Sequence, residues 1–176
     1  MLELKDSNKA LSDTGDILLS AKAKYKQGDY QGAIAEYTLA IDFAPNVALA
    51  VCCRGDAYYK LGKQEQALAD YDRAIELDPM MMLAYYRRGN LHYSVKKYEL
   101  AIAEYNLAIE RKSDFATAYV NRGYAQRELY GEQEGVSDWQ SAANLFKAQG
   151  NLDRYQQMVD LIDLNSSIDT LSGMLS

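Results

Sequence analysis

Residue types that usually carry catalysis or bind metals are scarce in this 176-residue chain. His92 is the single histidine. It lies 34 residues after Tyr58, which is the period of a repeat described below, so we expect His92 to pack in the core as the equivalent of Tyr58. Cys52 and Cys53 are adjacent, without the C-x-x-C spacing of a zinc site, and on a helix they point apart. No nucleophile–base motif, phosphate-binding loop or metal-binding helix motif occurs. We therefore expect no enzyme activity, no cofactor, no metal and no intrachain disulfide, in a reduced compartment.

Three arginines and three acids each recur every 34 residues: Arg54, Arg88 and Arg122, with Asp70, Glu104 and Asp138. Such a ladder could bind an anion through its guanidinium groups. In an antiparallel helical hairpin, however, facing residues have a nearly constant sum of positions, and Arg54 then faces Asp70. We therefore favour an ion pair within each repeat, with the bidentate geometry that arginine and carboxylate prefer.

Three further columns follow the same interval: large aromatics (Tyr37, Tyr71, Tyr105 and Trp139), small residues (Ala21, Gly55, Gly89 and Gly123) and a second small set (Ala33, Ala67, Ala101 and Gly135). Within one unit, helical periodicity stops at Gly62, and a second helix stops before Pro79. Gly55 is expected to let the ring of Tyr71 sit against bare backbone. A repeated helical hairpin stacks on its own copies, so the pattern predicts a long binding surface rather than a catalytic pocket.

These columns resemble the tetratricopeptide repeat, whose pattern W-x2-L-G-x2-Y…A-x3-F…P recurs at the same interval as the columns of this chain. The resemblance implies an all-α, right-handed solenoid of helix-turn-helix repeats with a C-terminal capping helix. Its four repeats are expected at 14–47, 48–81, 82–115 and 116–149. The repeat style is similar to that of small stand-alone members of the family in bacteria, cyanobacteria among them.

Three repeats depart from the pattern. Repeat one has Ala21 at the glycine position and Lys24 at the tyrosine position. Repeat three has Lys96 where the two preceding repeats have glycine. In repeat four the turn glycine, Gly131, comes one residue late, and Gly135 replaces the usual alanine. We therefore expect a slightly longer first helix and looser packing in repeat four.

Three flanking segments complete the chain. We expect a capping segment at 150–164, with its helix over 152–163, because the last hairpin would otherwise expose an apolar flank. Residues 1–13 are a candidate lead-in segment. The tail, 165–176, has two interpretations: an end that frays or packs on the cap, or an amphipathic plug that docks in a groove.

In tetratricopeptide arrays the first helix of each hairpin lines a concave groove, so the resemblance implies a scaffold or assembly adaptor that binds a partner's peptide or helix there. The expected groove residues are Lys22, Tyr25, Asp56, Tyr59, Tyr86, Arg87, Asn90, Tyr93, Asn121, Tyr124 and Arg127. They combine aromatic rings with hydrogen-bonding groups, which suits an extended peptide or a partner helix. The alternative is that the tyrosines only complete packing between repeats.

A subclass of the family holds the C-terminal carboxylate of chaperone tails with Lys, Asn and Arg side chains on three successive repeats. In this sequence the corresponding positions hold Leu18, Lys22, Cys53, Leu83 and Arg87. Only Arg87 fits that chemistry. We therefore expect no carboxylate clamp and no binding of chaperone tails.

The net charge and the hydropathy of the chain argue against two classes of binding partner, nucleic acid and the membrane interior. The net charge is −6 with no basic tract, which argues against nucleic acid. No apolar run approaches the ~20 residues of a membrane span, and the N-terminus does not read as a signal peptide, so we expect a cytoplasmic protein without direct membrane insertion. Two alternatives remain: a self-assembling module that associates through its terminal repeats or tail, and a peripheral assembly factor for a membrane protein complex.

Overall fold

The computed structural model describes the backbone of residues 2–174 and the side-chain environment of residues 14–131 and 133–166. This part of the chain is helical with short connections, which confirms the all-α fold class. The elements are α1 (Leu2–Lys26), α2 (Tyr30–Phe43), α3 (Ala48–Lys60), α4 (Gln64–Leu77), α5 (Met82–Ser94), α6 (Tyr98–Arg111), α7 (Ala116–Tyr130), the short 3-10 helix η1 (Glu132–Gly135), α8 (Val136–Ala148) and α9 (Leu152–Met174).

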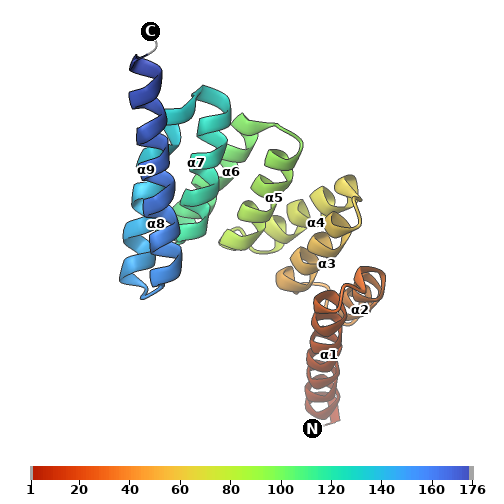
Figure 1. The fold of residues 1–176 in the computed structure, drawn as a ribbon. Coiled ribbons are helices and arrows are strands. Elements are labelled where there is room, and N and C mark those ends of the chain that lie inside the picture. Colours follow the sequence, from red (N-terminus) through yellow and green to blue (C-terminus); the bar gives the residue numbers. More distant parts are fainter. Residues whose placement is uncertain (1, 175–176) are drawn as a thin grey trace. The chain divides into compact units, whose positions relative to one another are not determined.

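The helices form two compact units. Unit 1 comprises residues 1–87, and unit 2 comprises residues 88–176, so the boundary lies within α5. In unit 1, α1 packs on α2, α2 on α3 and α3 on α4. In unit 2, α6 packs on α7, α7 on α8 and α8 on α9 (Figure 1). Within each unit, these helices therefore pack on their neighbours in sequence, as hairpin repeats require.

Residues in the left-handed backbone region end the first helix of each hairpin. Gly28 and Gly62 have φ values of +83° and +72°. Lys96 occupies the same position in the third repeat with a φ of +61°, so the turn keeps its shape although a side chain is present. Glycine reaches this region without steric cost, whereas lysine does not. The turn is therefore set by the geometry of the repeat and not by glycine alone.

Aromatic rings lie directly on glycine backbone in the three later repeats. A Cβ atom built on Gly55 would lie 2.8 Å from Cε1 of Tyr71, and one on Gly89 would lie 2.7 Å from Cε1 of Tyr105. Tyr71 and Tyr105 are each 1% exposed. The predicted contact between Gly55 and Tyr71 is confirmed, and it explains why the small and aromatic columns recur together.

The arginine ladder forms ion pairs inside the hairpins. Arg54 donates from Nε and Nη2 to the two carboxylate oxygens of Asp70, at 2.9 and 2.8 Å. Arg122 repeats this contact with Asp138, with both bonds at 2.6 Å, whereas Arg88 reaches both carboxylate oxygens of Glu104 through Nη2, at 2.9 Å. The ion-pair interpretation of the ladder is therefore confirmed, and these guanidinium groups have structural partners.

Repeat four confirms one expectation and corrects another. Helix α7 has 15 residues against 13 in α3 and α5, so its first helix is longer, as predicted. The packing is not loose, however. Trp139 is fully buried, and a Cβ atom on Gly135 would collide with the backbone oxygen of Gly123. Gly135 replaces the alanine of earlier repeats because the two helices approach more closely around the larger indole ring.

Helices extend into both flanking segments. Helix α1 is continuous from Leu2 to Lys26, so it includes most of residues 1–13, whose role as a lead-in segment stays a prediction. The capping helix was predicted over 152–163, and α9 instead continues to Met174 without a break at Ser166. The side chains of 1–13 and 167–176 lie outside the described residues, so both interpretations of the tail stay hypotheses.

Candidate functional site

The predicted site residues lie on the first helix of each hairpin. We call this set the inner face and consider it separately in each unit. Unit 1 contains Lys22 and Tyr25 on α1, Asp56 and Tyr59 on α3, and Tyr86 and Arg87 on α5; unit 2 contains Asn90 and Tyr93 on α5, and Asn121, Tyr124 and Arg127 on α7. Lys22 is exposed and the others are half-buried. Partial burial suits residues that pack at one end and meet a partner at the other.

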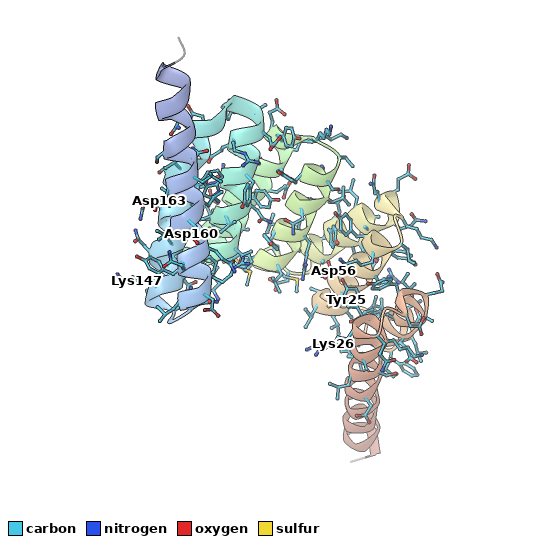
Figure 2. The ribbon with its side chains drawn as sticks, in the orientation of Figure 1. Tyr25, Lys26, Asp56, Lys147, Asp160 and Asp163 are labelled. Atoms are coloured by element: carbon cyan, nitrogen blue, oxygen red, sulfur yellow. The ribbon has the colours of Figure 1, made fainter. Side chains whose placement is uncertain are left out.

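Asp56 is the centre of the inner face in unit 1. Its Oδ1 accepts a hydrogen bond from the hydroxyl of Tyr71 at 2.9 Å, and its Oδ2 lies 3.3 Å from Nε of Arg87. The carboxylate thus joins three helices: α3, α4 and α5. Figure 2 labels Asp56 and Tyr25, which lie on α3 and α1 of the same unit.

Burial dominates the electrostatics around Asp56. It raises the pKa of Asp56, while the positive charge of Arg87 and the hydrogen bond from Tyr71 oppose that rise. The pKa of Tyr25 is also raised, first by burial and then by the charge of Asp56. The side chains of Asp56 and Arg87 are 14% and 40% exposed, so the acid is the more enclosed member of this pair.

A neutral counterpart of this network lies in unit 2. Asn90 Oδ1 accepts from the hydroxyl of Tyr105 at 2.9 Å and from Nδ2 of Asn121 at 2.8 Å. Asn90, Tyr105 and Asn121 stand one repeat after Asp56, Tyr71 and Arg87 respectively. One repeat therefore uses a charged pair, and the next uses two amides in the same arrangement.

The tyrosine hydroxyls in these networks were not predicted from the sequence. Asp56 and Arg87 were expected as separate ligand contacts, and Tyr71 was expected only in the core. The available signal was the spacing: an inner-face residue, an aromatic residue 15 positions later, and a second inner-face residue 31 positions after the first. In both networks the ring of the tyrosine packs in the core of the hairpin, and its hydroxyl group forms a hydrogen bond with an inner-face residue.

The C-terminal part of the inner face is aromatic. The ring of Tyr93 meets that of Tyr98 edge-on, with centroids 5.5 Å apart. The guanidinium of Arg127 lies 5.3 Å from the ring centroid of Tyr124 and pairs with Glu128 at 3.0 Å. Burial, followed by the charge of Glu128, raises the pKa of Tyr93. This surface offers flat rings beside a stacked cation, an arrangement common at protein interfaces.

Comparison with known families decides the classification. A family model for the TPR (tetratricopeptide) repeat matches residues 21–62, 55–96 and 89–129, which together span more than half of the chain. The chain belongs to the TPR family. TPR arrays are protein-interaction modules, and this chain is built as one.

Solved TPR structures share this fold. MamA 41-end from Desulfovibrio magneticus RS-1 is 17% identical with a TM-score of 0.67, over 89% of this chain and 95% of that chain. The first TPR of Spaghetti (RPAP3), bound to the HSP90 peptide SRMEEVD, is 28% identical with a TM-score of 0.63, over 70% and 94%. The Arabidopsis OM64 TPR domain is 25% identical with a TM-score of 0.62, over 67% and 98%. The likeness to MamA shows the fold alone. No curated protein matches the sequence.

The described residues offer little for other chemistry. Among them, no group of three or more His, Cys, Asp or Glu side chains is placed to hold a metal ion. Cys52 and Cys53 are free thiols, and burial raises the pKa of both, which makes them poor nucleophiles at neutral pH. Over residues 2–174, no helix combines the length and apolar character that a membrane crossing needs.

Asp56→Asn should remove a pH-dependent decrease in the free energy of unfolding of this TPR array. Because the pKa of Asp56 is raised above its usual value near 3.9, the folded chain keeps a proton that the unfolded chain has lost. The free energy of unfolding contributed by this group therefore falls as pH rises through a window that begins near pH 4. We expect Asp56→Asn to lack that fall, measured by urea denaturation at several pH values. The wild type, measured in the same series, should show that fall.

Proposed function

We propose that the inner face binds an extended segment or a helix of a partner protein, so that the chain acts as a scaffold or assembly adaptor. The observation that carries the proposal is the pairing of half-buried tyrosines with polar groups whose positions are fixed by hydrogen bonds across the repeats. Tyrosine supplies a large contact area at a small cost in conformational entropy. The RPAP3 neighbour, 28% identical, is bound to a peptide, which supports peptide binding as the function.

The polar groups of each unit favour different contacts. In unit 1, Arg87 uses Nε toward Asp56, and the Arg87 side chain is 40% exposed. In unit 2, the Asn90–Asn121 pair offers amide groups that suit the peptide bonds of an extended segment. A short peptide on such a surface is expected to bind at micromolar strength, roughly −8 kcal/mol.

The hydrogen bonds and ion pairs of the inner face limit which of its residues can be mutated without loss of stability. Asn90→Ala would leave the hydroxyl of Tyr105 without its acceptor, and Arg87→Ala would leave Asp56 half-buried without its cation. Both changes would mix loss of stability with loss of binding. Lys22→Ala with Tyr59→Ala is a cleaner variant, because Lys22 is exposed and Tyr59 is half-buried on the same inner face.

The test is a quantitative pull-down from the native lysate with wild type, the inner-face variant and a control. Leu39→Ala with Phe43→Ala is the control, because these exposed side chains lie on α2, outside the inner face. We expect a partner that wild type and control retain and the Lys22/Tyr59 variant loses, while all three proteins melt alike. Equal capture by all three would contradict inner-face binding.

A peptide arm tests the expected absence of a carboxylate clamp. Leu18, Cys53 and Leu83 supply no charge that suits a terminal carboxylate, and Asp56 neutralises Arg87. A peptide ending in Glu-Glu-Val-Asp should therefore bind weakly, and amidation of its C-terminus should change the affinity little in fluorescence anisotropy. Tight binding that amidation abolishes would show that the clamp expectation is wrong.

A further inference from the structure

The first helix of the array presents an exposed side away from its packing contacts. On α1, Leu19 is 68% exposed, and Ala23 and Lys26 on the same side are exposed as well. The opposite side of α1 is buried, since Ala21 is 0% exposed and packs in the cluster with Ala33 and other α2 residues. We call the side formed by Leu19, Ala23 and Lys26 the α1 flank.

The last helix has an exposed side of opposite charge. On α9, Leu152 is 63% exposed, and Gln156, Asp160 and Asp163 are also exposed. The buried side of α9 contains Met158, which packs on α8 residues. We call the side formed by Leu152, Gln156, Asp160 and Asp163 the α9 flank. Figure 2 labels Lys26 of the α1 flank and the two aspartates of the α9 flank.

The two flanks match in spacing as well as in charge. Lys26 follows Leu19 by seven residues, and Asp160 follows Leu152 by eight. At a rise of about 1.5 Å per residue, parallel helices that place Leu19 on Leu152 bring Lys26 beside Asp160 to within about one residue. Asp163 lies one turn further on and is also within reach of the long lysine side chain.

From this match we propose that the α9 flank of one copy of the chain docks on the α1 flank of a second copy. The contact joins different surfaces, so it is heterologous and leads to rings or open filaments. A two-fold contact between two α9 flanks would place acids against acids, and charge repulsion disfavours it. The proposal goes beyond inner-face binding and uses different residues, so either can fail without the other.

Parallel docking agrees with the direction of the repeats. Within a unit, the first helices of successive hairpins run in the same direction, because the chain reverses once inside each hairpin and once more at the connection to the next. Helix α9 follows α8 as the next first helix would, with Leu152 near the position one repeat after Ala116. An α1 helix placed parallel to α9 therefore continues the order in which first helices follow one another.

The experiment is sedimentation velocity over a wide range of protein concentration, because a contact of one helix flank is small and weak. Wild type should associate with rising concentration, and added salt should weaken the association, since the Debye length at physiological ionic strength is about 8 Å. Lys26→Glu and Asp160→Lys should each weaken self-association about tenfold by placing like charges together. Leu100→Gln, an exposed leucine on α6, is the control and should change nothing.

Mixing the two charge variants gives the decisive result. Each variant keeps one native flank, and the altered flanks of the two variants are complementary to each other. An equal mixture of Lys26→Glu and Asp160→Lys should therefore associate more strongly than either variant alone. A wild type that stays monomeric at all concentrations, association that both variants retain, or a mixture that fails to recover would each overturn the proposal.

Discussion

Trp139→Ala is expected to lower the free energy of unfolding by about 3–5 kcal/mol, the range for deleting a buried aromatic side chain. Trp139 is 0% exposed, and its Nε1 donates to the backbone oxygen of Val120 at 3.3 Å. The ring lies on bare backbone, because a Cβ atom on Gly123 would be 2.6 Å from Nε1. Removal of the indole leaves a cavity between α7 and α8 that rigid helix backbones cannot close.

Urea denaturation followed by far-UV circular dichroism measures this loss, since Trp139 is the only tryptophan and its fluorescence disappears with it. Hydrogen exchange should show the largest loss of protection in α7 and α8. Trp139→Tyr is the matched control, because tyrosine holds this position in the three preceding repeats: Tyr37, Tyr71 and Tyr105. The control should lose only about 1–2 kcal/mol. A loss below about 1 kcal/mol for Trp139→Ala would mean that repeat four repacks around the gap.

The contacts within a hairpin could be predicted because the same pair of residue types recurs in several repeats. Gly55 against Tyr71 and Arg54 against Asp70 follow from two columns that keep one interval, and the structure confirms both. A single pair of residues would have allowed many partners. A pair that recurs at a constant separation fixes the hairpin register, and the register fixes which side chains meet.

Contacts between repeats were harder to predict. The Asp56–Arg87 pair and its neutral counterpart join residues of successive repeats, and no single hairpin specifies them. Their residue types also change from one repeat to the next, so no column of identical residues marks them. The same reason limits the candidate site: the repeat pattern places the inner-face residues on the first helices, whereas the partner that we propose for them depends on side chains that vary between repeats.

Helix ends were missed for a different physical reason. The capping helix was expected to end at residue 163, and Ser166 follows that point with a side chain that can cap the first turn of a separate helix. In α9 its hydroxyl instead donates to the backbone oxygen of Ile162 at 3.0 Å, which keeps the serine inside the helix. A local capping signal is worth about 1 kcal/mol, less than the continuation of an existing helix can supply.

The ion-pair ladder should behave as a stability element in which each charge depends on its partner. Asp70→Ala is expected to cost about 3 kcal/mol, the lower end of the range for removing one member of a buried pair. The side chain of Asp70 is 8% exposed and that of Arg54 is 18% exposed, so the guanidinium would lose its two strongest hydrogen bonds in a mostly dry environment. Its bond to Thr38 Oγ1 at 3.2 Å would remain.

The double variant separates charge burial from packing. Arg54→Met with Asp70→Leu removes both charges and keeps similar volume, so its stability should lie within about 1 kcal/mol of wild type or above it. A cycle of Arg54→Met, Asp70→Leu and the double variant, measured by urea denaturation, should give a coupling energy of about 2–3 kcal/mol. Additive losses would mean that Arg54 and Asp70 do not act as a pair. Strong coupling would show that the recurring pairs fix hairpin register at little net gain in stability, which leaves the inner face free to vary between repeats.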